Sequence, residues 1–123
     1  MSGERRRHPI DPLRPVDLDR LDGRGPLWGI ASVDLNATLL CWGDGDGVAA
    51  HVNSERDVLV VVLDGWAIVC VDAARHIVVR HDALLVPRGS RWSIRAGGKG
   101  VRYLSVHLAR GGLRIEPART DAD

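Results

Sequence analysis

"HVNSERDVLVVVLDG", residues 51–65, is the stretch that decides the fold. It begins with a histidine, crosses polar and charged residues, continues through an apolar run at 58–63 and ends at Asp64-Gly65. A run that is apolar on both faces indicates a strand buried in a sandwich and covered again on its outer side, for example by a partner subunit. The Asp-Gly pair between apolar runs predicts a hairpin turn at residues 64–65.

Eight further short segments on either side are rich in Val, Ile, Leu and Trp and are separated by Gly, Pro, Asp and Ser. Several short strands between turn signals indicate an all-β antiparallel sandwich or barrel. No apolar period of 3.6 residues persists over three turns, so we expect no long helices. The predicted strands lie at residues 27–35, 37–42, 48–52, 57–63, 66–71, 76–80, 83–87, 92–96 and 101–109.

The 123 residues suit one domain, which we place at residues 26–116. Residues 1–25 lack a period and read as a flexible arm, with one helical turn over 15–23 as the alternative, and residues 117–123 read as a flexible tail. The net charge of +1 argues against nucleic acid or an acidic membrane as partner. No apolar run approaches the ~20 residues of a membrane span, and the charged N-terminus lacks the apolar core of a signal peptide.

We therefore expect a cytoplasmic protein. Lys99 is the sole lysine among many arginines, and this usage with no Phe suggests a GC-rich bacterial genome. Cys41 and Cys70 lie inside predicted strands without the spacing of a metal or redox motif, so we interpret them as small buried hydrophobic residues in a reducing compartment.

Two groups of residues recur at motif spacing. Gly45 is followed after five residues by His51-Val52-Asn53, and Gly65 closes this first group. The second group is "HDALLVPRGSRWSIRA", residues 81–96, in which Pro87 and Gly89 predict a tight turn. Over roughly Trp28 to Leu108 these groups resemble the two motifs of a small single-domain cupin. The resemblance implies an antiparallel double-sheet jelly-roll barrel.

The cupin motifs also imply a divalent ion that three histidines and one glutamate hold inside the barrel. Of these four positions only His51 carries the expected residue, since Asn53 and Trp92 stand at the other two histidine positions. The glutamate position falls on Val58 when it is counted back from Gly65, and on Asp57 when the shorter spacing is counted from Asn53. An amide, a valine and an indole are poor ligands for iron, zinc or manganese.

Each candidate site residue has a functional and a plain structural interpretation. His51 is either a ligand-binding group or a buried, hydrogen-bonded histidine. Asn53 either orients a ligand or caps a turn, and Trp92 either forms an aromatic wall or fills the space of the metal. Alternation places Tyr103, Ser105 and His107 on one strand face, which lines the pocket or meets solvent.

We expect a metal-free, non-enzymatic module that binds a small molecule of unknown identity through His51, Asn53, Trp92, Tyr103 and His107, with no cofactor. The alternative is a metal-dependent cupin enzyme, of dioxygenase or isomerase type, in which His51, Glu55, Asp57 and His107 hold iron, zinc, manganese or nickel. Glu55 and Asp57 otherwise read as solvated carboxylates. A third hypothesis is a structural or regulatory protein whose barrel Trp92 plugs. The apolar run at 58–63 predicts a homodimer.

Overall fold

The computed structural model describes residues 14–109, in which seven strands pair with antiparallel neighbours only. This confirms the predicted all-β antiparallel architecture. The one helical element of this part is a 3₁₀ turn, η2 (Leu18–Arg20), and no helix there is long and apolar enough to cross a membrane. The strands are β1 (Gly25–Ala31), β2 (Leu35–Trp42), β3 (Gly47–Val52), β4 (Val58–Val71), β5 (Ala74–Val79), β6 (Ala83–Val86) and β7 (Arg91–Leu108).

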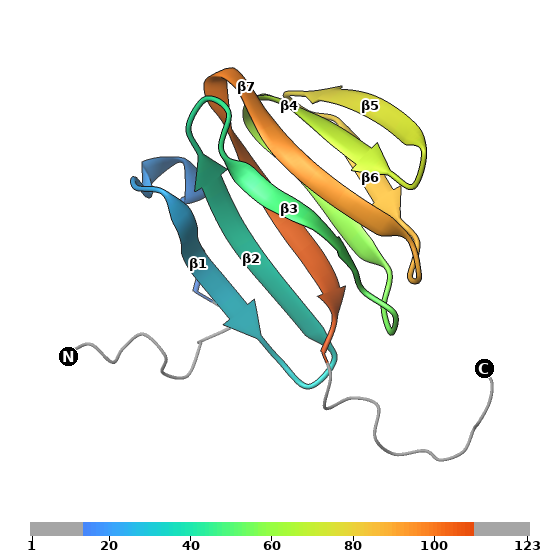
Figure 1. Ribbon diagram of the computed structural model, residues 1–123. Helices are drawn as coiled ribbons and strands as arrows, with labels where there is room; N and C mark the ends of the chain where they lie inside the picture. The colour runs from blue at the N-terminus through green and yellow to red at the C-terminus, as the bar shows by residue number, and fades with distance from the viewer. Residues whose placement is uncertain (1–13, 110–123) are drawn as a thin grey trace.

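Two long bent strands, β4 and β7, build both layers of the molecule (Figure 1). In the first layer, residues 58–65 of β4 pair with β6 and with residues 101–106 of β7, which in turn pair with β2 and through it with β1. In the second layer, residues 67–71 of β4 pair with β5 and with residues 92–96 of β7, whose other neighbour is β3. The barrel is therefore one folded sheet with β4 and β7 at its centre.

The predicted hairpin at Asp64-Gly65 is wrong, because both residues lie within β4. Gly65 has φ 75°, and the register with β7 shifts on either side of it, so the strand bends there and passes into the second layer. The segments 57–63 and 66–71 are thus one strand, and the segments 92–96 and 101–109 join in the same way across a glycine-rich stretch, residues 97–100. The tight turn lies instead at Asp72-Ala73, between β4 and β5.

The single predicted segment 27–35 is also wrong, since it contains the end of β1 and the start of β2. The hydroxyl of Ser32 accepts hydrogen bonds from the backbone N–H groups of Asp34 and Leu35, at 3.3 and 3.0 Å. A serine hydroxyl that bonds to the backbone two and three residues on stabilises a turn against a continuing strand. β1 and β2 are consequently an antiparallel pair.

The core lies between the two layers and consists mainly of valines that alternate along the strands. Val58, Val60 and Val62 of β4 point inward and are almost fully buried, whereas Leu59 points outward and is 37% exposed. The other core residues are Ala67, Val69, Val78, Val86, Trp92, Ile94, Ala96, Val101 and Tyr103.

The end of the predicted N-terminal arm packs on the first layer. η2 lies in the predicted helical turn at 15–23, and Arg102 of β7 donates a hydrogen bond from Nη1 to the Leu18 carbonyl at 2.8 Å. β1 begins at Gly25, the last residue assigned to the arm. The predictions for residues 1–13 and for the 117–123 tail lie outside the described residues.

Candidate ligand site in the barrel interior

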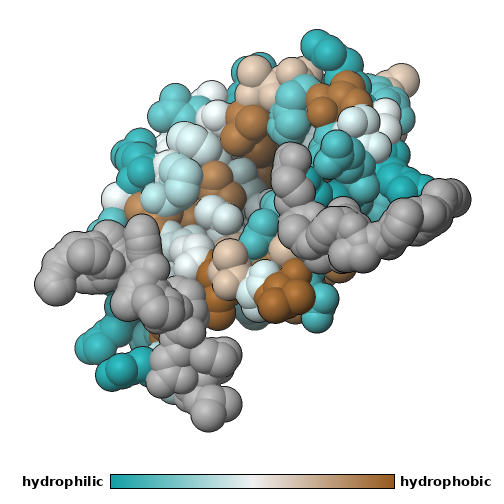
Figure 2. Space-filling view, turned by 90° about the horizontal axis from the view of Figure 1, so that it is seen from below, coloured by the Kyte–Doolittle hydropathy of each residue, from teal (hydrophilic) through white to brown (hydrophobic). Residues whose placement is uncertain are grey.

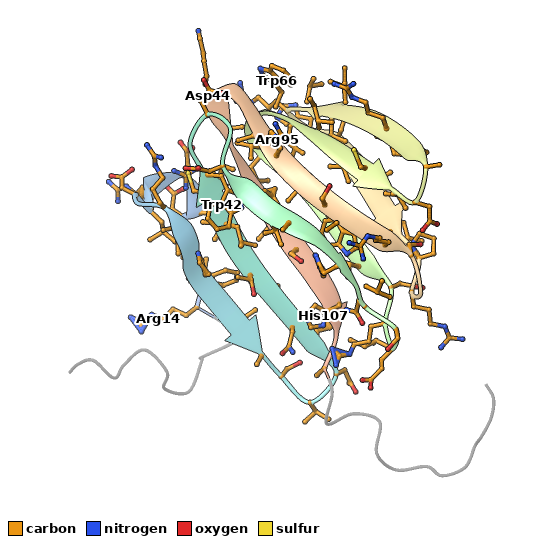
Figure 3. All side chains as sticks on the ribbon, viewed as in Figure 1. Arg14, Trp42, Asp44, Trp66, Arg95 and His107 are labelled. Carbon is orange, nitrogen blue, oxygen red and sulfur yellow. The ribbon has the colours of Figure 1, made fainter. Side chains whose placement is uncertain are left out.

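Polar side chains line one end of the interior on the first layer. Tyr103 lies in the core, so alternation along β7 points Ser105 and His107 toward the same inner face. Across the sheet, Asn36 is the partner of His107 and Thr38 is the partner of Ser105. The face of β7 that carries Tyr103, Ser105 and His107 is thus the inner one, a choice that alternation along the strand did not decide. Figure 3 shows His107 at the end of the molecule opposite Trp42.

The second layer contributes an aromatic pair to the interior. His51 of β3 is the cross-strand partner of Trp92 of β7, and their ring centroids are 5.0 Å apart at an interplanar angle of 48°. Trp92 is only 6% exposed, while His51 is half-buried and its Nδ1 lies 2.9 Å from the Ala49 carbonyl oxygen. The imidazole is therefore anchored by the backbone on one side and by the indole on the other.

Two buried N–H groups near this end lack a hydrogen-bond partner among the described residues: Trp92 Nε1 and Arg56 Nε. The Arg56 side chain is 11% exposed, and its Nη2 lies 3.5 Å from the mostly exposed carboxylate of Glu55. Arg56 belongs to the loop that leads from the strand of His51 to Val58. Because an unpartnered buried donor destabilises a fold by about 1–3 kcal/mol, each of these groups is a place where an added acceptor gains free energy.

The positions implied for a metal do not form a ligand set. Asn53 Oδ1 accepts hydrogen bonds from the backbone N–H groups of Glu55 and Arg56, at 3.2 Å each, so its amide caps the turn. Val58, at the glutamate position, is a core residue, and the neighbouring Asp57 accepts from the Arg88 N–H at 2.8 Å instead. Within residues 14–109, no three His, Cys, Asp or Glu residues come together to hold an ion. The set His51, Glu55, Asp57 and His107 is therefore not assembled, and the residues present do not fit a metal of the cupin type.

Tyr103 is a core residue of the first layer. Its hydroxyl accepts a hydrogen bond from Trp42 Nε1 at 3.1 Å, and the residue is 1% exposed. Burial raises the pKa of the phenol above its ordinary value of 10.0, and the hydrogen bond from Trp42 lowers it in part. Tyr103 is thus a neutral, bonded core residue, and its hydroxyl is already engaged.

The structure brings His51 and Trp92 into contact and places Tyr103 and His107 on the inner face of the opposite layer, whereas Asn53 is used in a turn. No pattern in the sequence points to Arg56, Asn36 or Thr38 as site residues. Arg56 looked like one more charge in a polar loop, and no local pattern marks it as buried. Asn36 and Thr38 become recognisable only once β2 is paired with β7.

No protein-family model and no curated protein matches this chain. Solved structures do match: a cupin superfamily protein from Desulfitobacterium hafniense DCB-2 has a TM-score of 0.68 at 24% identity, over 82% of this chain and 95% of that one. The cupin domain of Schizosaccharomyces pombe Cnp3 has a TM-score of 0.61 at 21% identity, over 69% of this chain and 62% of that one.

The chain has the cupin fold. A conserved double-stranded beta-helix protein from Klebsiella pneumoniae is also similar, with a TM-score of 0.66 at 17% identity, over 77% of this chain and 89% of that one. Laid on the cupin fold, the first motif runs through β3, the 53–57 loop and the first half of β4, and the second runs from the end of β5 into β7. His51 and Trp92 come from different motifs, and the fold makes them cross-strand partners.

Proposed function

We propose that this cupin-fold protein binds a small molecule at the polar end of its interior without a metal ion. The observation that carries the proposal is the buried, unpartnered Nε1 of Trp92 beside the half-buried ring of His51. An indole N–H is a donor only, so the matching ligand offers an acceptor oxygen or nitrogen to it. The indole and imidazole rings supply a flat apolar wall for the rest of that ligand.

The chemistry of the side chains supports a ligand with an oxygen acceptor. Arg56 adds a buried guanidinium with a free Nε at the loop that closes this end. Hydrogen bonds from a guanidinium to a carboxylate are charge-assisted and stronger than neutral ones. His107, Asn36 and Ser105 present further polar groups from the opposite layer. Figure 2 views the molecule from this end, where hydrophobic side chains lie recessed between hydrophilic ones.

The absence of a metal follows, in this proposal, from the donor set. Asn53 uses its oxygen in a turn, Val58 belongs to the core and Trp92 has no lone pair to give. We therefore expect purified protein to contain no stoichiometric iron, zinc, manganese or nickel, and a chelator to leave its melting temperature unchanged. A bound structural ion would stabilise by roughly 3–4 kcal/mol at 100–1,000 times its Kd, and its removal would lower the melting temperature visibly. Elemental analysis that finds such an ion, and loses it with His51→Ala, restores the enzyme hypothesis.

Binding is tested with benzoate as a planar carboxylate and benzamide as its neutral counterpart. We expect benzoate to shift the indole N–H resonance of Trp92, which is assigned with Trp92→Phe, and His51→Ala and Arg56→Gln to weaken the effect. His76→Ala is the control, because His76 is half-buried on β5 and makes no contact with Trp92 that the structure records. If neither compound moves the resonance, this ligand class is rejected. Trp92, a member of the core cluster, then plugs the barrel as in the structural hypothesis.

We also propose a homodimer. Outward-facing residues of the first layer form an outer apolar face, made of Leu35, Leu59, Leu85, Val106 and Leu108. Four of its members are 37–58% exposed, and the pairs Leu35–Leu108, Leu59–Leu85 and Leu59–Val106 are cross-strand partners. Apolar neighbours on one sheet face form a contiguous patch of the kind that a second copy covers.

The free, half-buried Cys41 and Cys70 support a reducing, cytoplasmic setting.

A further inference from the structure

The end of the barrel opposite His107 has a cavity of about 210 Å³ whose lining is rich in positive charge. It lies where β2 ends and where β4 and β7 bend, near Trp42 in Figure 3. Cys41, Arg102 and Asp64 form one row across β2, β7 and β4 on the outer side of the first layer. The cavity is therefore separate from the interior site described above.

Glycines allow the three strands to approach each other at this point. A Cβ atom at Gly65 would collide with the carbonyl oxygen of Gly100, and one at Gly100 would come within 2.6 Å of the Trp42 oxygen. Gly65 and Gly100 both have positive φ, at 75° and 84°, which a glycine adopts without strain. The backbone of β2, β4 and β7 thus forms a fixed base for the charged side chains around it.

Three cations and one carboxylate line the cavity: Arg24, Lys99, Arg102 and Asp64. The chain as a whole has a net charge of only +1, so this is a local excess of positive charge. Arg102 Nη1 donates a hydrogen bond to the Leu18 carbonyl at 2.8 Å, and this bond holds the side chain in place. The other N–H groups of the guanidinium take no part in this bond. Lys99 and Arg102 form no ion pair with any carboxylate of residues 14–109.

Arg24 is placed by its contact with Gly43. Its guanidinium lies against the Cα of Gly43, where a Cβ atom would collide with it. The Nη1 atom is also 3.9 Å from Asp46 Oδ2, but both side chains are more than 60% exposed. A pair at that distance and exposure is weak and screened by salt. Arg24 therefore stays available to a ligand in the cavity.

We propose that this cavity binds a small oxyanion, namely inorganic phosphate or the phosphate group of a small molecule. Arginine forks present paired N–H donors that match phosphate oxygens, and a lysine adds a compact positive charge. Lys99 and Arg102 have no ion-pair partner among residues 14–109, and the Arg24–Asp46 pair is weak, so little existing ion pairing is lost when a phosphate binds. The cavity is large enough for a phosphate group with a small substituent. Both free phosphate and a phosphorylated small molecule are therefore tested.

The experiment titrates the full chain with inorganic phosphate and, in a second arm, with glycerol 3-phosphate, at constant ionic strength. We expect saturable binding by calorimetry, and Lys99→Gln and Arg24→Gln each to weaken it at least fivefold. The matched control is Arg75→Gln, which removes one exposed arginine of β5 and leaves the affinity within twofold. Tighter binding of glycerol 3-phosphate assigns the site to a phosphorylated molecule, and equal affinity assigns it to the free oxyanion.

Cys41 gives an independent readout, because it lines the cavity whereas Cys70 does not. Phosphate should slow alkylation of Cys41, followed by peptide mass spectrometry, and leave the rate at Cys70 unchanged. The proposal is overturned if no saturable binding occurs up to about 10 mM phosphate, ten times the Kd of a 1 mM site. It is equally overturned if Lys99→Gln and Arg24→Gln bind as the native chain does, or if Cys41 is not protected.

Discussion

Tyr103 is a core residue whose polar atom is paired with Trp42. It is the only tyrosine of the chain, and its hydroxyl accepts the Trp42 N–H while its ring packs among core valines. Buried tyrosines and tryptophans usually satisfy their polar atom in this way. Trp92 departs from the rule, because its N–H has no partner among the described residues, and this contrast is what directs the functional proposal to Trp92.

Tyr103→Phe should lower the free energy of unfolding near neutral pH by about 1 kcal/mol, because the Trp42 N–H loses its acceptor. Burial raises the folded-state pKa of Tyr103, so below about pH 10 both states are protonated and the phenol adds no pH dependence. As pH rises past the unfolded-state value toward the folded-state value, the unfolded chain ionises first and stability falls. Urea unfolding at several alkaline pH values should show a shallower fall for Tyr103→Phe.

The ultraviolet titration of tyrosinate provides the check on this prediction, since one residue accounts for the whole signal. We expect its midpoint in the folded protein to lie above that of the urea-unfolded chain. A folded midpoint at or below the unfolded one would contradict the burial of the phenol.

At the scale of single elements, the bends in β4 and β7 are the features on which the two-layer structure depends. Both strands change layer beside glycines with positive φ, and the register between them shifts at this point. Bulges and glycines allow a strand to bend or twist sharply, so that one strand contributes to two sheets. The charged cavity follows from the same bends, because they bring Asp64, Lys99 and Arg102 to one place.

Gly65→Ala should lower the free energy of unfolding by more than about 2 kcal/mol, since the new side chain meets both an unfavourable φ and the Gly100 carbonyl. Gly45→Ala is the matched control. Gly45 has a similar φ of 81°, but its Cβ would have no neighbour within 4 Å, so we expect a cost of about 1 kcal/mol from the backbone alone. Denaturant unfolding of both variants measures the difference. Equal losses would show that the close approach of β4 and β7 adds nothing to the cost.

For the whole molecule, the two sides of the folded sheet differ in how well they are covered. The inner side is closed by the opposite layer, whereas the outer apolar face of the first layer leaves leucines of four strands partly exposed. A second copy that packs the same face against it would form a closed twofold assembly. The second layer exposes Trp66, Ile77 and Val79 on its outer side as well, which supplies a comparison surface.

Leu85→Glu should convert the dimer to a monomer, because a charge on the outer apolar face of each copy would be buried without a partner. Ile77→Glu introduces the same charge at a more exposed position, 63% against 55%, on the second layer, and we expect it to leave the dimer intact. Sedimentation velocity at about 10 μM, well above the Kd of a tight dimer, distinguishes the two states. A monomeric native chain at that concentration rules out the dimer, and dissociation by Ile77→Glu alone places the interface on the second layer.

The sequence by itself determined the fold class and most of the strands, because alternation, apolar runs and turn residues are local signals. The Pro87–Gly89 turn, the place of His51 and the motif spacing sufficed to predict the cupin fold. The hairpin at Asp64-Gly65 failed for a physical reason: a glycine with positive φ serves a tight turn and a bend within a strand equally well, and only the pairing of Gly65 with Val101 of β7 distinguishes them.

The composition of the sites was decided by the tertiary structure. Whether Val58 or Asp57 points inward depends on where β4 begins its pairing with β6, and the structure assigns the inner position to Val58. The burial of Arg56, the inner direction of His107 and the contact of His51 with Trp92 depend in the same way on strands distant in the chain. The charged cavity joins Arg24, Asp64, Lys99 and Arg102, and no local period connects these residues. A strand pattern specifies which residues share a face, but the partner opposite that face is set by long-range register.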